Sequence, residues 1–491
     1  MGQTSIILFL VKPPPNRSRF PLYQTQYLFN KNPIIKMKIS KYTFLFDVNE
    51  INYFTYNTLS NALIEIDKQI YSDLKKNEGR AELSDITFDK ELCDILFENG
   101  ILTENDEDDY LKYKAIIKKM RDQTNFMHLT LAPTMDCCFN CFYCFEKCKG
   151  GKYMPSETID AIIKYINSRK NIEIIKLTWF GGEPLMAIKE MVEFNEKLSK
   201  IWMKEIDNDI ITTGYHINKN VIEILKKIGV NSIQITIDGI KETHNQVKYL
   251  PDCPDVFSKV WNNIELLHEL DPDIKITIRV NLTKKNAHEY EQLLELFWKT
   301  FKNSKNITIA PSFVINRGTI DCISNDCLNS LLFNHDERTK YILSLAGRGI
   351  DTPYIRYPNR RFGECAIRNN IAISFDPEGY AYKCWEVIGD KKYAIGRLNL
   401  NGELIELNAT NINRQLYGAD PLEDANCVKC KYLPICGGGC PIQRIQNKFE
   451  NGANNPCIYY KGYMLDFLKF YIERNKQNFS NPSVNPVGSK S

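Results

Sequence analysis

The sequence predicts an α/β fold built on a parallel sheet, open or closed into a partial (β/α)6 barrel, with a small module before it and a cysteine-rich extension after it. Six strand-like apolar runs between residues 126 and 312 alternate with segments whose apolar residues recur at helical spacing. Near-continuous apolar strands joined by helical crossovers are typical of a buried parallel sheet. The segment Cys137–Cys144, which contains four cysteines, follows the first strand, at the face where such folds carry their active site.

Composition excludes several classes of partner. The 491 residues carry 63 Lys plus Arg against 60 Asp plus Glu, a net charge of +3. This balance gives no general attraction to nucleic acid or to an anionic membrane, and we expect neither as a partner. Sixteen cysteines in a chain without an export signal indicate metal binding before disulfides, and ten of them fall into two motif regions. We expect a cytoplasmic protein.

The first 36 residues show no periodic pattern. Their apolar run, Ile6–Val11, is too short to span a membrane and lacks the basic front and small-residue cleavage site of a signal peptide. A clean alternating pattern begins directly after Met37. We therefore expect residues 1–36 to be disordered or an artefactual extension, with Met37 as the true first residue.

A small N-terminal module is expected over residues 37–110. Residues 41–54 predict two short strands joined by a turn, and helical patterns follow over residues 63–76 and 88–102. This order of elements predicts a winged-helix-like module. The acidic run Glu104–Asp109 is expected to be a solvated linker.

The barrel is expected within residues 120–312. Its six predicted strands are residues 126–132, 174–179, 209–214, 232–237, 274–280 and 307–312. Residues 313–360 have no strong pattern and are expected to be a linker, followed by a cysteine-rich domain over residues 361–475. Residues 476–491 are rich in Asn, Ser and Pro and are expected to be a disordered tail.

The first cysteine motif has the spacing CxxxCxxC, formed by Cys137, Cys141 and Cys144. One loop with this spacing can wrap an iron–sulfur cube through three of its corners and leave one iron without a protein ligand. The spacing alone leaves two other assignments open. Cys138 and Cys148 could complete a tetrahedral zinc site, or the cysteines could be buried in a packed loop.

Two neighbouring motifs indicate which assignment of the cysteine loop is to be expected. Pro133-Thr134 precedes the cysteines, and Phe180-Gly-Gly-Glu-Pro-Leu185 follows the second strand on the same face. With these motifs the sequence resembles the radical S-adenosylmethionine (SAM) enzymes over residues 126–311. The resemblance implies a SAM-binding 4Fe–4S cluster held by the three cysteines, an external electron donor of the flavodoxin or ferredoxin type, and a 5′-deoxyadenosyl radical that abstracts hydrogen from a substrate.

The same resemblance assigns the residues that contact SAM. Glycines let backbone approach a small ligand closely, and a glutamate can pair with an ammonium group. Lys248 stands where the family commonly has Arg, so it would bind the SAM carboxylate as a point charge, and His244 is expected to be structural. The cofactor-binding residues implied are Tyr143 near the adenine, Gly181, Gly182, Glu183 and Pro184 at the methionine amine, Thr213 after the third strand, Lys248 at the carboxylate and Asn281 at the ribose.

The second cysteine region has the order C, GxxxxC, CxxCxxxxxCxxxC, C. A zinc ribbon needs four ligands, and seven cysteines exceed that number. The order resembles the SPASM extension of radical SAM enzymes over residues 361–460, which holds two auxiliary clusters and so implies three 4Fe–4S clusters in all. By position, the outer cluster would be held by Cys427, Cys430, Cys436 and Cys457, and the inner cluster by Cys365, Cys384 and Cys440.

The inner cluster is short of one ligand. Fully ligated members of the family carry a further cysteine between the first two, but residues 366–378 contain none. Either the inner cluster has an open iron, which could hold a substrate thiolate, or it borrows Cys322 or Cys327 from the linker.

The SPASM extension occurs mainly on enzymes that modify peptides or proteins, so the resemblance implies a peptide maturase acting on a ribosomally made peptide. The winged-helix-like module would bind its leader segment along a strand edge. Sulfatase maturases place Asp directly after the cysteine of GxxxxC, whereas Trp385 stands here and Glu386 is the nearest candidate base. We therefore expect a thioether or carbon–carbon crosslink. Epimerisation, sulfatase-maturase-like oxidation and a non-enzymatic iron–sulfur or zinc-binding peptide-binding protein are the alternatives.

Overall fold

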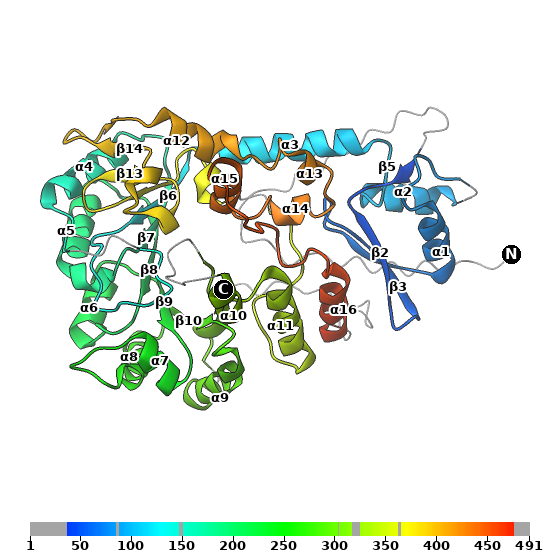
Figure 1. Cartoon of the computed structure of the whole chain (residues 1–491). Coiled ribbons are helices and arrows are strands. Elements are labelled where there is room, and N and C mark those ends of the chain that lie inside the picture. Colours follow the sequence, from blue (N-terminus) through cyan, green and yellow to red (C-terminus); the bar gives the residue numbers. More distant parts are fainter. Residues whose placement is uncertain are drawn as a thin grey trace.

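The computed structural model describes residues 37–84, 88–146, 151–302, 304–316, 325–361 and 365–475. The expectations for residues 1–36 and 476–491, and for Cys148 and Cys322, lie outside these ranges. Figure 1 shows a helix-covered parallel sheet at one end of the molecule, the N-terminal module at the other, and the cysteine-rich region between them.

The central sheet consists of parallel strands that neighbour each other in chain order. They are β6 (Phe126–Leu131), β7 (Ile174–Trp179), β8 (Glu205–Thr212), β9 (Ser232–Ile237), β10 (Lys275–Leu282) and β11 (Ile307–Phe313). The crossover helices are α4 (Ser156–Asn167), α5 (Ile188–Ser199), α6 (Lys219–Lys227), α7 (Lys241–Val247), α8 (Val256–Leu270) and α9 (Tyr290–Thr300). The predicted parallel sheet is confirmed. In the described residues β11 pairs only with β10, so the six strands form an open sheet.

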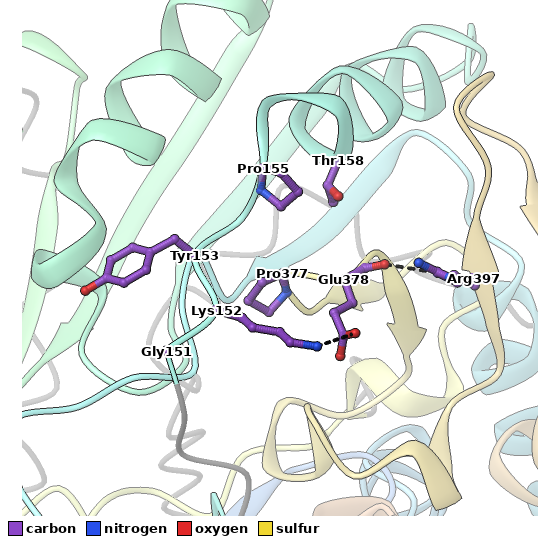
Figure 2. Close-up of a pocket in the computed structure, with 8 residues that line it drawn as sticks. All are labelled: Gly151, Lys152, Tyr153, Pro155, Thr158, Pro377, Glu378 and Arg397. Carbon is purple, nitrogen blue, oxygen red and sulfur yellow. Dashed lines mark hydrogen bonds and ion pairs between the residues drawn. The ribbon is translucent and has the colours of Figure 1, made fainter.

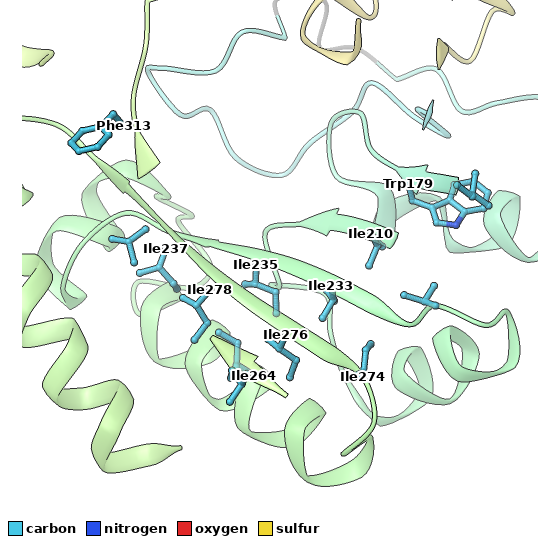
Figure 3. Close-up of a cluster of buried hydrophobic side chains, with 14 of the residues drawn as sticks. Trp179, Ile210, Ile233, Ile235, Ile237, Ile264, Ile274, Ile276, Ile278 and Phe313 are labelled. Carbon is cyan, nitrogen blue, oxygen red and sulfur yellow. The ribbon is translucent and has the colours of Figure 1, made fainter. Parts of the chain in front are cut away.

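The strands bury one face against the helices. Along β9, Ile233, Ile235 and Ile237 are fully buried, whereas the alternate side chains of Gln234 and Thr236 are only half-buried. Figure 3 shows the isoleucines of β9 and β10 gathered beside Ile264 of α8. Each such side chain stabilises the fold by roughly 1.5–3 kcal/mol. Because side chains alternate along a strand, the polar residues are left for the other face of the sheet.

The cysteine-rich region extends the same sheet. Strand β12 (Ile373–Phe375) pairs in parallel with β6, and the antiparallel strands β13 (Tyr380–Tyr382), β14 (Gly396–Leu398) and β15 (Leu404–Ile405) follow. Ala132, just beyond β6, also donates its amide to the carbonyl of Phe375 at 3.0 Å. The start of the cysteine loop and the second cysteine region are therefore joined by backbone hydrogen bonds.

The remaining helices lie in the linker and in the cysteine-rich region. They are α10 (Asn325–Leu331), α11 (His335–Gly347), α12 (Ala409–Asn413), α13 (Ala425–Val428), α14 (Leu433–Cys436), α15 (Pro441–Phe449) and α16 (Met464–Arg474). The expected linker thus contains two helices that its weak pattern did not predict. No helix in the described ranges is both long and apolar enough to cross a membrane.

The N-terminal module contains an antiparallel sheet of β2 (Thr43–Val48), β3 (Asn52–Asn57) and β4 (Leu63–Ile66), with helices α1 (Lys68–Asn77) and α2 (Lys90–Glu98). A short pair, β1 (Lys38–Ile39) with β5 (Leu102–Thr103), closes it. The helix expected over residues 63–76 was wrong in its first part, which is β4. The carboxylate of Asp67 caps α1 by accepting from the amide of Ile70, so the helix begins only at Lys68.

The acidic run is not a solvated linker. Its last four residues form the first turn of α3 (Asp106–Arg121), which Asn105 caps by accepting from the amide of Glu107. Acidic side chains at a helix N-terminus are favoured by the helix dipole, which is why a run that reads as a linker forms a helix here. Tyr110, Tyr113 and Ile117 are buried along one side of α3.

The N-terminal module is fixed to the end of the linker and to the cysteine-rich region through polar contacts that are buried or partly buried. The hydroxyl of Tyr56 donates to the carbonyl of Pro358 and that of Tyr357 to the carbonyl of Asn61, both at 2.6 Å. The hydroxyl of Thr58 donates to the carbonyl of Lys431, also at 2.6 Å, directly after Cys430. The module therefore packs beside the second cysteine motif.

One ion pair between α3 and the cysteine-rich region is almost fully buried. The guanidinium of Arg121 donates to both carboxylate oxygens of Asp420 at 2.6 and 2.8 Å, and the two side chains are only 10% and 6% exposed. We expect Arg121→Ala to lower the free energy of unfolding by about 3–5 kcal/mol, because it leaves a buried carboxylate unpaired. The urea midpoint of the protein's fluorescence measures this.

A matched control is the exposed pair of Lys75 and Glu78, 2.6 Å apart on the surface near the end of α1. Lys75→Ala should change stability by less than about 1 kcal/mol. Equal shifts of the urea midpoint for Arg121→Ala and Lys75→Ala would show that the buried ion pair of Arg121 and Asp420 stabilises the protein no more than an exposed pair does.

Candidate functional site

The first cysteine motif lies on a loop that begins directly after β6. Hydrogen bonds within the loop shape it: Asp136 donates its amide to the Thr134 hydroxyl at 3.0 Å, and the Asp136 carboxylate accepts from the amide of Cys137 at 3.1 Å. The amide of Phe139 points at Cys137 Sγ at 3.5 Å. The structure thus places the predicted ligands at the carboxyl end of the first barrel strand, half-buried and unoxidised.

The cysteines are not arranged around a single ion. In the described ranges, no three His, Cys, Asp or Glu side chains converge closely enough to hold one metal ion. A tetrahedral zinc site needs such convergence, whereas a cubane takes its thiolates at separate irons. A hydrogen bond with Cys138 and burial raise the pKa of the Cys137 thiol. Iron binding would therefore release a proton there.

The segment after β7 is hydrogen-bonded to this loop. The amides of Phe180, Gly182 and Glu183 donate to the carbonyls of Leu131, Thr134 and Asp136 at 2.9, 3.1 and 2.7 Å. A Cβ on Gly182 would lie 2.0 Å from the carbonyl oxygen of Asp136, and Gly181 has φ +108° with its Cβ position 2.4 Å from the oxygen of Thr134. The glycines are therefore required. The atoms that lie closest to Gly181 and Gly182 are backbone atoms of the cysteine loop.

Glu183 joins the ends of two strands. Its side chain is fully buried, and its carboxylate accepts four hydrogen bonds from neighbouring groups. The donors are the amide of Leu185 at 3.0 Å, the hydroxyl of Thr212 at 2.6 Å, and the amide and hydroxyl of Thr213 at 2.7 and 2.6 Å. Four donors fill the acceptor sites of a carboxylate. Pro184 then starts a short 3-10 helix, Pro184–Ala187. Sequence reasoning selected Thr213 but missed Thr212.

Tyr143, Asp238 and Lys248 form a buried polar cluster beside the cysteine loop. Asp238 accepts from the hydroxyl of Tyr143 and pairs with the ammonium of Lys248, whose Nζ also lies 3.5 Å from the Tyr143 oxygen. Burial lowers the pKa of Lys248, but Asp238 and then Cys141 outweigh it, so the pKa lies above its usual value. Lys248 is 2% exposed and charged, not a solvated lysine.

Neighbouring groups hold this polar cluster in place. His244 is buried and its Nδ1 accepts from the amide of Asp238 at 3.2 Å, while burial lowers its pKa to about 3. It is therefore neutral, in agreement with a structural role. Asn281 accepts from Arg279 Nε at 3.1 Å, and Asn286 donates to the carbonyls of Asp238 and Asn281 at 2.7 and 3.0 Å. Asn281 thus lies at the same strand ends as Asp238.

The cysteines expected at the inner cluster lie together. Burial first, and then the charges of Glu386, Cys365 and Cys440, raise the pKa of the Cys384 thiol. Desolvation by surrounding protein and the neighbouring Cys440 likewise raise the pKa of Cys365, although its side chain is exposed at the surface. These mutual effects indicate that Cys365, Cys384 and Cys440 lie near one another.

The cysteines expected at the outer cluster form a second group. Burial and Cys457 raise the pKa of Cys436, and the charges of Cys457, Cys430 and Cys427 all act on Lys461. Gly439 makes the grouping possible, because a Cβ there would lie 1.6 Å from the carbonyl oxygen of Pro456. The chain before Cys440 can therefore pass against the chain before Cys457.

Cations accompany the cysteine groups, and sequence reasoning missed all of them. Arg444 donates to Cys427 Sγ at 3.3 Å and to the Asp424 carboxylate at 2.7 Å, and Lys461 Nζ lies 3.4 Å from Cys457 Sγ. Lys383, beside Cys384, is buried, and burial lowers its pKa to about 7. Such side chains have no motif; proximity to a cysteine in the sequence was the only signal, and only for Lys383 and Lys461.

An aromatic row connects the two cysteine regions. Phe145, next to Cys144, stacks on Phe180 with ring centroids 6.1 Å apart, and Phe180 lies 6.1 Å from Trp385. Glu386 follows in the short 3-10 helix Trp385–Val387 and is half-buried.

Cys327 forms a disulfide in the structure, so in this state it is not available as a ligand.

A surface cavity of about 420 Å³ lies near the first cysteine loop but is a separate feature (Figure 2). Tyr153 and Pro155 line one side, and Glu378 and Arg397 line the other. Lys152 pairs with Glu378 at 2.9 Å across it, and Arg397 Nε donates to the Glu378 carbonyl at 3.1 Å. None of the predicted cofactor-binding residues is among the residues that line it.

Comparison with known proteins agrees with this geometry. Residues 131–297 match the Radical SAM superfamily. The chain is 21% identical to the radical SAM cyclopropyl synthase TigE of Paramaledivibacter caminithermalis, over 89% of this chain and 95% of that protein. It is 25% identical to a cysteine-type anaerobic sulfatase-maturating enzyme of Clostridium perfringens, over 71% of this chain and 97% of that protein.

The solved structure of anSMEcpe with bound AdoMet has a similar fold, with a TM-score of 0.56 and 19% identity over 72% of this chain and 99% of that chain. The family match covers the cysteine loop, the Gly181–Pro184 segment and the Tyr143–Asp238–Lys248 cluster. Residues 131–297 are therefore a Radical SAM domain, and a sulfatase-maturating enzyme and a cyclopropyl synthase are among the relatives of the chain.

Proposed function

We propose that this radical SAM enzyme is a peptide maturase that abstracts hydrogen from a ribosomally made peptide and forms a crosslink. The observation that carries the proposal is the pair of cysteine groups in a SPASM-like extension, joined by the β12–β6 ladder to the SAM-binding loop. One relative is named a sulfatase-maturating enzyme, and a structure similar to this fold is a complex with a Cys-containing peptide. Both support a polypeptide substrate.

The residues of the site fit a SAM-bound cluster. In this proposal Cys137, Cys141 and Cys144 hold the SAM-binding cluster, and the charged Lys248, already beside Cys141, supplies a point charge for the SAM carboxylate. When bound, the cluster and SAM supply a 5′-deoxyadenosyl radical. The buried hydrogen bonds of Glu183 fix the Gly181–Pro184 segment against the loop, so the methionine end meets a preformed surface.

Three 4Fe–4S clusters follow from the same proposal. Cys427, Cys430, Cys436 and Cys457 hold the outer cluster, and Cys365, Cys384 and Cys440 hold the inner one. Since Cys327 is in a disulfide, an open iron at the inner cluster is favoured over a ligand borrowed from Cys327. A flavodoxin or ferredoxin would supply electrons.

A bond-forming reaction is favoured over oxidation to formylglycine. Trp385 stands where sulfatase maturases have their aspartate, and it belongs to an aromatic row that reaches the Gly181–Pro184 segment. A cyclopropyl ring closes by a carbon–carbon bond, so the name of TigE supports carbon–carbon bond formation. A thioether is the second form of the crosslink, and epimerisation is the alternative reaction.

The N-terminal module would recognise the leader of the peptide. In the described residues β2 and β4 each pair with one strand only, β3, which leaves an edge on either side of the three-stranded sheet. An extended peptide can add to such an edge through main-chain hydrogen bonds. The module also packs beside Cys430, so a bound leader would continue toward the cysteine-rich region.

Anaerobic reconstitution with SAM, a reductant and short Cys-rich or Gly-rich precursor peptides encoded by neighbouring reading frames tests the proposal. We expect a peptide mass lower by two hydrogens, no reaction with a hydrazide reagent for aldehydes, and no product with Cys141→Ala. Deuterium uptake from D₂O without mass loss would show epimerisation, and a hydrazide-reactive product would show oxidation to formylglycine. Either result would contradict crosslinking.

Glu183→Gln tests the hydrogen bonds by which Glu183 connects the ends of β7 and β8. The amide would place N–H groups against the donors of Thr212 and Thr213 and remove charge-assisted hydrogen bonds worth roughly 1.5–3 kcal/mol each. We expect SAM to bind at least about tenfold more weakly by equilibrium dialysis, with unchanged iron content. Glu157→Gln, at an exposed position in the first turn of α4, is the control. Equal SAM affinity in both variants would refute the role.

Glu386→Gln tests the proposed base. The change keeps the size of the side chain but removes proton acceptance, so the variant should still release 5′-deoxyadenosine while product formation falls by roughly 10²-fold or more. Liquid chromatography of the nucleoside and mass spectrometry of the peptide measure the two separately. Glu403→Gln, exposed in the same region, should match the unaltered enzyme. Normal product from Glu386→Gln would dismiss Glu386 as the base.

A further inference from the structure

Lys383 has an unusual place in the fold. In the described part of the chain two lysines are buried, Lys248 and Lys383, which are 2% and 4% exposed. Lys248 has a carboxylate partner, Asp238. Lys383 has none there: its ammonium donates to the backbone carbonyls of Asn369 and Ala372 at 2.6 and 2.5 Å. In the described residues this amine is thus enclosed without an anionic side chain to pair with it.

Within the described residues, the hydrogen bonding of Lys383 is also incomplete. An ammonium carries three N–H donors, and two carbonyls satisfy only two of them. Burying a charge without a counter-charge is strongly unfavourable, so a buried lysine normally faces an anion. In its thiolate form, Cys365 lies near enough to raise the pKa of Lys383, and Cys384 is the neighbour of Lys383 in the sequence. Both cysteines belong to the inner group.

We propose that Lys383 is the internal counter-cation of the inner auxiliary cluster and raises the reduction potential of that cluster. The inference rests on the proposed function, which assigns Cys365, Cys384 and Cys440 to the cluster. A thiolate-bound iron–sulfur cluster is anionic and gains negative charge on reduction. The negative charge of the cluster favours the protonated form of Lys383, whose pKa burial otherwise lowers to about 7, and a buried cation stabilises the reduced form more than the oxidised form.

The cations at the outer group differ in this respect. Arg444, which donates to Cys427, is paired with Asp424, so much of its charge is balanced already. Lys461, which contacts Cys457, lies near the surface, where solvent and salt screen it. Lys383 has neither a carboxylate partner in the described residues nor solvent around it. Its effect should fall on the inner cluster and leave the outer cluster unchanged.

The test is a redox titration followed by electron paramagnetic resonance. It uses the full chain with Cys137, Cys141 and Cys144 changed to Ala, which leaves the two auxiliary clusters, and the signal lost in Cys384→Ala identifies the inner one. Lys383→Gln keeps N–H donors for the carbonyls of Asn369 and Ala372 but removes the charge. We expect it to lower the midpoint potential of the inner cluster, with the outer midpoint unmoved.

Two variants complete the comparison. Lys383→Arg retains the charge and should stay close to the unaltered midpoint. Lys391→Gln removes an exposed lysine of the same region, one paired with Glu378, and should shift neither cluster. If Lys383→Gln fails to retain the inner cluster while Lys383→Arg retains it, the charge requirement is supported directly.

Other outcomes overturn the inference. The midpoint potential of the inner cluster could be unchanged in Lys383→Gln, or the cluster could be lost in both Lys383→Gln and Lys383→Arg. Either result would show that Lys383 only fixes the backbone of Asn369 and Ala372. Failure of the proposed function is seen separately: the parent chain would then contain no iron that depends on Cys365, Cys384 or Cys440, and the inference would fall with it.

Discussion

The site depends on one backbone contact, the pairing of Gly181–Glu183 with Thr134–Asp136. Its hydrogen bonds of 3.1 and 2.7 Å are possible only because residue 182 has no side chain, since a Cβ would lie 2.0 Å from the carbonyl oxygen of Asp136. The contact fixes the cysteine loop against the end of β7. The hydrogen bonds of Glu183 to Thr212 and Thr213 then connect the same segment to β8, so the ends of three strands and the cysteine loop form one unit.

Charge is the second constraint on the molecule. Thiolate clusters bring negative charge into partly buried positions, and the cysteine groups have cations in contact with them or acting on them. Lys248 balances Asp238 and the cysteine loop, whereas Lys383 has no side-chain counter-charge in the described part of the chain. This distribution is what a protein built around anionic cofactors requires, and buried lysines would otherwise be costly.

The sheet could be predicted from the sequence because its strands are long apolar runs with helical segments between them. The spacing of the first cysteine motif and of Gly181–Pro184 indicated the Radical SAM domain, which the family match over residues 131–297 confirms. The helix α3 could not, because its acidic first turn reads as a linker until Asn105 and the dipole are considered. Strand β4 was hidden for a related reason: its apolar residues continue smoothly into those of α1, and only the cap at Asp67 separates them. The partners of Lys383 and Arg444 lie 11 to 25 residues before them in the chain, outside the span of any helix or strand pattern that contains these cations.

The central claim is that one chain holds a SAM-binding cluster and two auxiliary clusters on the cysteines grouped here. Mössbauer spectroscopy of ⁵⁷Fe-reconstituted protein, with iron analysis, tests it most directly. The account predicts about twelve irons per chain in 4Fe–4S form, falling to about eight when Cys137, Cys141 and Cys144 are replaced by Ala. About four irons per chain, all lost in that variant, would contradict it.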